Sequence, residues 1–151
     1  MNKSLVLCKP DAVHRGLVGK IIARFEAKGL KIAALKMMRL STSTAEKLYA
    51  EHKGKPFYDL LMEFMAEQPI VAMIVQGAEA PRRVRVMLGD TMPWNAQPGT
   101  IRGDWGNHPR LNLAHASDSD ESAEREIPLF FEPSEILDYM RCDEPWLDQG
   151  D

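Results

Sequence analysis

The stretch Pro69-Ile70-Val71-Ala72-Met73-Ile74-Val75 is apolar throughout and opens on a proline. A short continuous apolar run with such a boundary is typical of a buried strand. It is the clearest strand in the chain, and the patterns on either side of it alternate between strand and helix. The elements expected from those patterns decide the fold class.

Two further strands and three helices are expected before this strand. The strands cover residues 4–8 and 31–40, and the helices cover residues 17–30, 43–52 and 58–66. The first strand is a short apolar run that stops before Pro10, a residue that breaks regular structure. In the first helix, apolar residues recur at helical spacing, and Gly29 is a natural C-terminal stop.

A helix, an irregular stretch, a short strand and a last helix are expected after the central strand. The helix covers residues 80–88 and is closed by Gly89. Residues 90–111 show no periodicity and are interrupted by three prolines and three glycines. The short strand covers residues 111–114 and the last helix residues 119–130. An irregular stretch of this length inside a small domain tends to be functional.

The resulting order, β-α-β-α-α-β-α-loop-β-α, fits a ferredoxin-like α+β (α/β) sandwich, in which helices pack on one antiparallel sheet. Periodicity alone leaves other α+β topologies open. The chain has 151 residues and no internal repeat or linker, so we expect a single domain over residues 1–151.

Composition argues against several classes of protein. The formal net charge is −3, so no basic field calls for a nucleic-acid partner. Cys8 and Cys142 lie far apart and have no cysteine at metal-binding spacing, which argues against both a disulfide framework and a metal site. The apolar run near the N-terminus is too short for a signal peptide or a membrane span. We expect a small cytoplasmic enzyme.

The octapeptide Asn-Leu-Ala-His-Ala-Ser-Asp-Ser at residues 112–119 carries the strongest chemical signal. It sets His115 among small side chains that leave the imidazole accessible. Ser-Asp-Ser is a helix N-cap composition, and the backbone N–H groups at a helix start favour anions. Imidazole is also a nucleophile that can carry a phosphoryl group at neutral pH. The pattern favours a histidine nucleophile at a phosphate site, although such a histidine on its own is more often a surface or capping residue.

This octapeptide resembles the active-site signature of the nucleoside diphosphate kinases, in which Asn, two residues, His, Gly or Ala, Ser and Asp follow in order. The resemblance extends from Leu5 to about Trp146. Its further motifs are Lys9-Pro10-Asp11, Arg15-Gly16-Leu17-Val18-Gly19, Arg24-Phe25-Glu26, Pro56-Phe57-Tyr58, Arg85-Val86-Met87-Leu88-Gly89, Pro98-Gly99-Thr100-Ile101-Arg102-Gly103-Asp104 and Glu121-Ser122-Ala123-Glu124-Arg125-Glu126-Ile127. Motifs in this order and at the family's spacing make a specific signal, and among the α+β topologies the resemblance selects the ferredoxin-like one.

The resemblance implies transfer of the terminal phosphate of a nucleoside triphosphate to a nucleoside diphosphate through a phosphohistidine at His115. It implies that Glu126 and Ser117 orient the histidine and that Tyr49 lies near it. The implied nucleotide contacts are Lys9, Arg85, Thr91 and Arg102 on the phosphates, Asn112 and Lys9 on the sugar hydroxyls, and Phe57 stacked on the base. Asp118 would act through water on a Mg²⁺ ion that the nucleotide carries.

Residue chemistry agrees with these roles. The chain has no Walker-type loop and no glycine-rich kinase loop, so side chains must hold the phosphates. Arginine's planar fork suits that task. Base contact by stacking alone would give broad specificity, because every base has a π face.

Each of these residues also has a simpler interpretation. Phe57 could be a core aromatic, and Glu126 could be an exposed helix carboxylate. Arg85 could lie on a solvated face, where we leave its neighbours Arg82 and Arg83. We expect the other histidines, His14, His52 and His108, on the surface.

The chain departs from the commonest family pattern at several positions. Ala116 stands where glycine is more usual, so the backbone there must avoid a glycine-only conformation. Leu111 replaces a basic residue, and Trp94 and Trp105 are bulky residues in the irregular stretch. The resemblance implies that family members assemble through the irregular stretch, so the changes there bear on its rigidity and on subunit contacts.

Assembly and two other functions remain to be considered. Leu129, Phe130, Phe131 and Trp146 put more apolar surface near the C-terminus than a lone small domain readily hides. We therefore expect a homo-oligomer, with a hexamer favoured over a tetramer. The alternatives to a kinase are a ferredoxin-like nucleotide- or nucleic-acid-binding module and a catalytically silent relative. The complete set of site residues argues against both.

Overall fold

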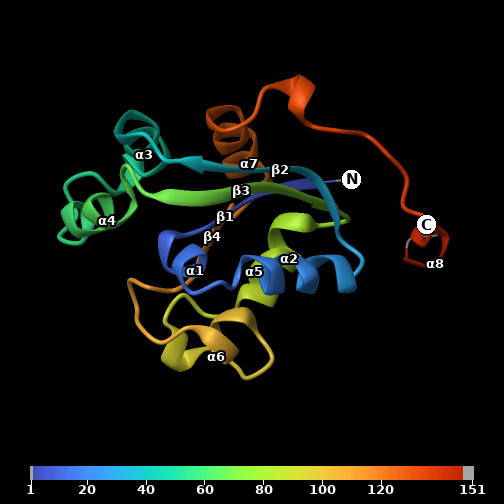
Figure 1. The fold of residues 1–151 in the computed structure, drawn as a ribbon, viewed down its shortest axis with the longest axis horizontal. Coiled ribbons are helices and arrows are strands. Elements are labelled where there is room, and N and C mark those ends of the chain that lie inside the picture. Colours follow the sequence, from blue (N-terminus) through green and yellow to red (C-terminus); the bar gives the residue numbers. More distant parts are fainter. Residues whose placement is uncertain (1, 148–151) are drawn as a thin grey trace.

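The computed structural model describes residues 2–147; Met1 and residues 148–151 of the expected domain lie outside the described residues. Within that range, four strands form one sheet in the order β2-β3-β1-β4 (Figure 1). They are β1 (Asn2–Cys8), β2 (Lys31–Arg39), β3 (Pro69–Gly77) and β4 (Ala114–Ala116). Every neighbouring pair is antiparallel. The expected antiparallel α+β sandwich is confirmed.

The helices connect and cover these strands. The α-helices are α1 (Pro10–His14), α2 (Val18–Ala27), α3 (Thr42–Leu48), α4 (Tyr58–Met65), α5 (Ala80–Leu88), α6 (Ile101–Trp105), α7 (Asp120–Glu126) and α8 (Glu144–Leu147). Short 3-10 helices are η1 (Ala50–His52), η2 (Pro93–Asn95), η3 (Ile127–Leu129) and η4 (Pro133–Glu135). None of the helices in this described part of the chain is long and apolar enough to cross a membrane.

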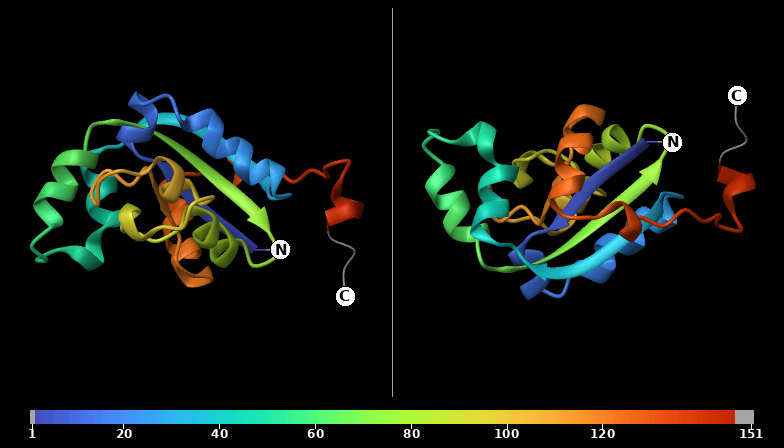
Figure 2. Two further views of the ribbon diagram at one scale, coloured as in Figure 1. Left: turned by 90° about the horizontal axis from the view of Figure 1, so that it is seen from below. Right: turned by 90° about the horizontal axis from the view of Figure 1, so that it is seen from above.

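The sheet separates two hydrophobic cores, because successive side chains of a strand point to opposite faces. On β1, Val6 and Cys8 enter the core beneath α2 and α5, whereas Leu5 and Leu7 enter the core formed with α3, α4 and the segment after α7. The views in Figures 1 and 2 show α2 and α5 on one face and α7 on the other. The apolar run of β3 follows from this position, since both of its faces are covered.

Several expected boundaries were wrong. Residues 90–111 are not structureless, because η2 and α6 lie within them. Residues 10–14 form α1, with Pro10 in the first turn of the helix as well as at the end of β1. The helix expected over residues 43–52 breaks at Tyr49. The last helix ends at Glu126 rather than Phe130 and continues as the 3-10 turn η3, which contains Pro128.

The short strand was expected at residues 111–114 and lies at residues 114–116. Leu113 has φ +76°, outside the extended region of a regular strand. Strand pairing therefore begins one residue later, where Ala114 lies opposite Cys8 and His115 opposite Leu7. This register places His115 on the edge strand β4, which pairs with the inner strand β1.

The C-terminal segment differs from expectation in part. Phe130 and Phe131 are buried in the second core, at 4% and 5% exposure, so they add no apolar surface. Trp146 is 85% exposed, and Leu137 and Met140 are also exposed. After η4 the chain runs along the sheet edge toward α8, at the far end of β2 (Figures 1 and 2). There Glu144 Oε1 of α8 lies 3.0 Å from Lys31 Nζ of β2.

Candidate active site

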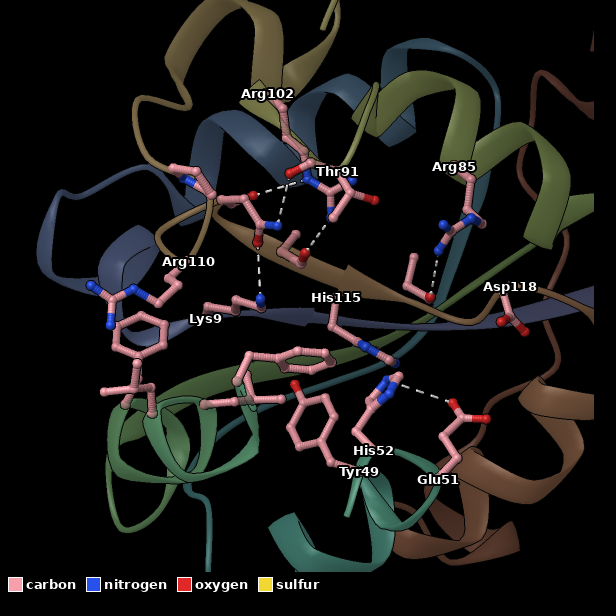
Figure 3. A pocket seen from close by; sticks show the side chains of 18 of the residues that line it. Lys9, Tyr49, Glu51, His52, Arg85, Thr91, Arg102, Arg110, His115 and Asp118 are labelled. Carbon is pink, nitrogen blue, oxygen red and sulfur yellow. Dashed lines mark hydrogen bonds and ion pairs between the residues drawn. The ribbon is translucent and has the colours of Figure 1, made fainter. Parts of the chain in front are cut away.

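A cavity of about 530 Å³ opens between the edge strand β4, the helices α3 and α4, and the segment around α6 (Figure 3). Ten of the eleven site residues expected from the sequence line it: Lys9, Tyr49, Phe57, Arg85, Thr91, Arg102, Asn112, His115, Asp118 and Glu126. These residues come from segments spread over most of the chain. The eleventh, Ser117, lies just behind the cavity wall and contacts Glu126.

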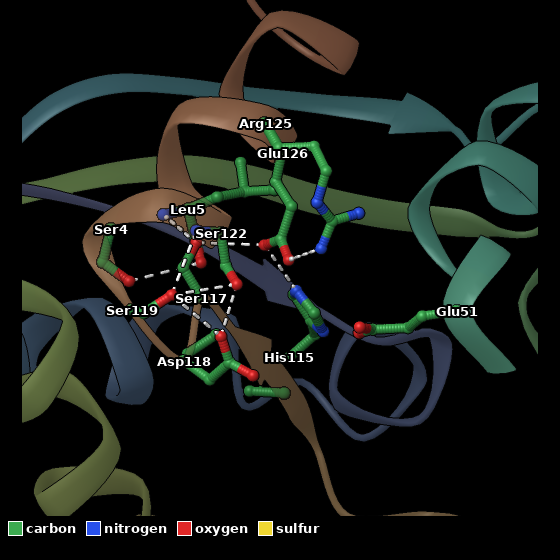
Figure 4. Close-up of polar contacts among 12 residues, drawn as sticks. Ser4, Leu5, Glu51, His115, Ser117, Asp118, Ser119, Ser122, Arg125 and Glu126 are labelled. Carbon is green, nitrogen blue, oxygen red and sulfur yellow. Dashed lines mark hydrogen bonds and ion pairs between the residues drawn. The ribbon is translucent and has the colours of Figure 1, made fainter.

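Two side chains, Glu126 and Ser117, hold the imidazole of His115 through a chain of hydrogen bonds (Figure 4). His115 Nε2 lies 3.0 Å from Glu126 Oε1, and Ser117 Oγ donates to the same carboxylate oxygen at 3.0 Å. Ser117 Oγ in turn accepts the backbone N–H of Leu5 at 3.0 Å. Because a carboxylate oxygen only accepts, Nε2 is the donor in this contact, and in the neutral imidazole the lone pair therefore lies on Nδ1.

Short-range sequence features bring Glu126 to the ring. Ser119 caps α7 through its hydroxyl, which accepts the N–H of Ser122 at 3.1 Å. The helix then runs back over β1, so that Glu126 in its last turn is buried beside β4. The interpretation of Glu126 as an exposed helix carboxylate is therefore wrong.

Tyr49 forms another wall of the histidine site. Its ring meets the His115 imidazole edge-on, with 5.9 Å between centroids. The hydroxyl is buried and has no hydrogen-bond partner among the described residues. Burial first, and the Glu126 carboxylate second, raise the pKa of Tyr49, so the phenol stays protonated.

Lys9 and Asn112 form a linked pair on the opposite wall. Lys9 Nζ donates to Asn112 Oδ1 at 2.9 Å, and Asn112 Nδ2 donates to the carbonyl of Thr91 at 3.1 Å. Burial lowers the pKa of Lys9 to about 8, helped by the positive charge of Arg102 and opposed by Asp11. An incoming polyanion would favour the protonated form of this lysine.

The two expected arginines differ in their surroundings. Arg102 is buried and its fork donates to three carbonyls, those of Asn112 (3.1 Å), Gly89 (3.0 Å) and Ala114 (2.7 Å). Burial lowers the pKa of Arg102 to about 10. Three of its five N–H groups thus hold the backbone, and two remain for a ligand. Arg85 is exposed and donates to the Ala116 carbonyl at 3.2 Å (Figure 3).

Asp118 faces the cavity mouth next to Arg85 (Figure 3). Hydrogen bonds from Ser122 and then Ser119 lower the pKa of Asp118, and Arg85 adds to the effect, so the group is an anion at neutral pH. Within residues 2–147, no group of three or more His, Cys, Asp or Glu side chains could hold a metal ion. A single carboxylate of this kind fits a hydrated Mg²⁺ that arrives on a ligand's phosphates, and does not fit a resident metal centre.

Phe57 lines the cavity together with the apolar side chains of Leu60, Leu61 and Phe64. Phe57 is 44% exposed, so it is not a core residue. Its ring lies 5.3 Å from that of His52. His52 lines the cavity together with Glu51, and His52 Nε2 lies 3.8 Å from Glu51 Oε1. The expectation of an ordinary surface position for His52 was therefore wrong. Sequence reasoning also missed further lining residues: Leu60, Leu61, Phe64, Pro109 and Arg110.

Some of the other residues expected on the surface are exposed, and others are partly buried. Arg82 is on the surface, paired with Glu79 at 3.1 Å, whereas Arg83 is only partly exposed and lines a separate hollow. His14 is exposed and His108 is partly buried. Ala116 lies in β4 and is not among the described residues with positive φ, so it needs no glycine.

The two bulky tryptophans and Leu111 lie away from the cavity lining. Trp105 packs under the guanidinium of Arg24, 4.2 Å from the ring centroid. Trp94 is 68% exposed and donates to the Asn107 carbonyl at 3.2 Å. Leu111 is exposed next to the hollow beside α4.

Comparisons with known proteins agree on one family. The family model described as nucleoside diphosphate kinase matches residues 2–136. Nucleoside diphosphate kinases of Archaeoglobus fulgidus and Schizosaccharomyces pombe are 50% and 52% identical to this chain, each over 97% of both sequences. The solved structure of the Halobacterium salinarum enzyme in complex with CDP matches with a TM-score of 0.95 at 44% identity, over 98% of this chain and 99% of that one. The Borrelia burgdorferi enzyme with bound vanadate and ADP, described as a transition-state mimic, matches with a TM-score of 0.89 at 38% identity, over 94% of each chain. The chain belongs to the nucleoside diphosphate kinase family.

Proposed function

We propose that this enzyme transfers the terminal phosphate of a nucleoside triphosphate to a nucleoside diphosphate through a phosphohistidine at His115. The kinase activity is that of its family. The observation that carries the residue assignment is the contact between His115 Nε2 and the buried Glu126, within the wall of a nucleotide-sized cavity. One site serves donor and acceptor in turn, which makes the mechanism ping-pong.

Nδ1 of His115 is the proposed nucleophile, because Glu126 occupies Nε2. Its lone pair forms the bond to the γ-phosphorus while the bond from phosphorus to the β,γ-bridging oxygen breaks, and the nucleoside diphosphate leaves with that electron pair. Glu126 keeps the Nε2 proton in place and offsets the positive charge that develops on the ring. A β-phosphate oxygen of the second nucleoside diphosphate then attacks the phosphorus and restores neutral His115.

The cations of the cavity are proposed to hold the phosphates. Lys9, Arg85 and the two free N–H groups of Arg102 offset charge on the transferring group, and the Thr91 hydroxyl lies on the same lining. Asn112 and Lys9 are proposed to contact the sugar hydroxyls. The Lys9–Asn112 bond, which fixes both side chains before a ligand enters, supports this role.

Phe57 is proposed to stack on the base. Its exposed ring in the cavity lining, among the apolar side chains of Leu60, Leu61 and Phe64, supports this role. Stacking without base-specific hydrogen bonds gives broad base specificity.

Magnesium is proposed to enter with the nucleotide. Asp118, ionised and facing the cavity mouth, would hold the ion's water ligands. Bound there, Mg²⁺ would offset the negative charge of the phosphates. Arg85, adjacent to Asp118, would then meet the same phosphates from the protein side.

We also propose a single domain over residues 1–151, a cytoplasmic location and a homo-oligomer, with a hexamer favoured over a tetramer. The exposed apolar side chains of the C-terminal segment, Leu137, Met140 and Trp146, support assembly.

Exchange of labelled phosphate tests the proposed mechanism. The protein is incubated with γ-labelled ATP and magnesium and then chased with GDP, which should receive the label. His115→Ala should abolish transfer, whereas His108→Ala, outside the cavity lining, should retain it. Nucleotide binding with no transfer by the wild type would instead favour a binding module or a silent relative.

A further inference from the structure

The backbone just before the nucleophile strand is strained. Leu113 is fully buried and has φ +76°, which is rare for a residue with a side chain. The N–H of Ala114 donates to the carbonyl of Asn112 at 2.9 Å, so Leu113 is the central residue of a γ-turn of the strained, positive-φ kind. This turn joins Asn112, which binds Lys9, to the strand that carries His115.

Neighbouring groups bind the N–H and the carbonyl of Leu113 and the carbonyls on either side of it. Asp11 Oδ2 accepts the N–H of Leu113 at 3.1 Å, and the N–H of Lys9 donates to the Leu113 carbonyl at 2.9 Å. Arg102 donates to the carbonyls on either side of Leu113, those of Asn112 and Ala114. A strained backbone conformation persists only where its surroundings over-determine it. In residues 2–147, the side chains that bind the backbone of the Leu113 turn are those of Asp11 and Arg102, and Arg102 lines the cavity whereas Asp11 does not.

The placement of Asp11 is costly, which argues that it has a purpose. Its second oxygen, Oδ1, is buried and has no hydrogen-bond partner in residues 2–147. Burial, its largest influence, raises the pKa of Asp11. As a residue of the first turn of α1, it also favours that helix, but any exposed aspartate would do so without the burial.

We propose that Asp11 is a positioning residue of the active site: its carboxylate holds the strained turn at Leu113 and thereby sets Asn112 against Lys9 and the start of the strand that carries His115. Asp11 does not line the cavity, so it acts only through these residues. The inference rests on the proposed function, because it concerns how the same site is kept in shape.

Asp11 has a second influence, on the charge of Lys9. The charged groups that bear on Lys9 are Arg102 from α6 and Asp11 from α1. Asp11 raises the pKa of Lys9 and so offsets part of the lowering caused by burial and Arg102. Removing this negative charge would lower the pKa further, so Lys9 would lose its proton at a lower pH. Asp11→Asn removes the charge but keeps an oxygen that can accept the Leu113 N–H, whereas Asp11→Ala removes both.

Steady-state kinetics of the full chain separate the two influences. At pH 6.5, where Lys9 is protonated, Asp11→Ala should lower kcat by about 10-fold to 100-fold, because small displacements of the reacting groups strongly reduce the rate of the chemical step. Asp11→Asn should recover most of that loss. In both variants the alkaline limb of kcat/KM should move to lower pH. Glu67→Ala is the matched control: Glu67 accepts the N–H of Thr42 at 3.0 Å, far from the cavity lining, and its loss should leave kcat unchanged.

The outcomes distinguish this inference from the proposed function. A wild-type protein that fails to transfer phosphate overturns the proposed function. An active wild type with unchanged kcat in Asp11→Ala, or with equal loss in Asp11→Ala and Asp11→Asn at pH 6.5, overturns the positioning role. If Asp11→Ala does not fold, Asp11→Leu replaces it, because leucine is close to aspartate in size but has no acceptor for the Leu113 N–H. A kcat at pH 6.5 well below that of Asp11→Asn supports the positioning role, and equal kcat values in the two variants contradict it.

Discussion

Glu126→Gln is the substitution that tests most finely how the protein activates its histidine. The change keeps the size of the side chain and its acceptor oxygen, so the 3.0 Å contacts with His115 Nε2 and Ser117 Oγ can persist. It removes the negative charge, which lies in a side chain that is only 5% exposed. The neutral ring loses little, whereas the positively charged ring of the transition state loses a buried counter-charge.

The size of the effect follows from the kind of hydrogen bond that is changed. A bond to a charged group contributes about 1.5–3 kcal/mol and a neutral one about 0.5–1.5 kcal/mol. The difference of roughly 1–2 kcal/mol falls on the transition state, and each 1.36 kcal/mol is a factor of ten in rate. We therefore expect kcat to fall by about 5-fold to 30-fold. KM should change little, since Glu126 faces the ring rather than the phosphates.

Single-turnover kinetics with ATP and magnesium measure the step directly, as the rate at which the phosphoenzyme forms. The control is Glu124→Gln, an exposed carboxylate of the same helix α7, which should transfer at the wild-type rate. A Glu126→Gln rate within twofold of wild type would refute the account of histidine activation. So would a loss as complete as that of His115→Ala, because the nucleophile itself is still present.

Three further predictions concern the base, the lysine and the assembly. Phe57→Ala should weaken binding of all nucleotides by roughly 1–3 kcal/mol in calorimetry, and a loss confined to purines or to thermal stability would contradict stacking. Because the pKa of Lys9 is lowered to about 8, kcat/KM should decline as the pH rises through about 8, and a flat profile to pH 10 would count against Lys9 as a required cation. Light scattering should find an oligomer that Trp146→Asp weakens by placing a charge on an exposed apolar side chain; a concentration-independent monomer in the wild type would contradict assembly.

The elements with a clear local sequence pattern could be predicted. The apolar run of β3 and the helix at residues 80–88, closed by Gly89, were placed from the sequence, because both cores demand apolar residues there and glycine readily takes the positive φ of +87° after the helix. The helix α6 was missed because five residues are too few to show a period. The sequence does carry one signal for this helix, because threonine is a preferred N-cap residue. In the structure, Thr100 Oγ1 accepts the N–H of Gly103 at 3.0 Å.

Tertiary contacts decide the features that the sequence does not reveal. Leu113 lies in a stretch whose sequence is typical of a strand, but its φ is positive. The hydrogen bonds around it come from Asp11, about a hundred residues earlier in the chain, and from Arg102 in α6. The motif residues of the site were found because each belongs to a recognisable short pattern. Arg110 and Phe64 carry no such pattern, and they reach the cavity only because the segment before β4 folds over α4. His52 was missed for the same reason, since its place depends on the break after α3.

The most direct test of the central claim is to locate the phosphoryl group on the protein. The wild type is incubated with γ-labelled ATP and magnesium, separated from nucleotide, digested under alkaline conditions and mapped by mass spectrometry. The account predicts an acid-labile, base-stable label on His115, which disappears when GDP is added before digestion. A label on His52, His108 or a serine, or transfer of phosphate at near-normal rates by His115→Ala, would contradict it.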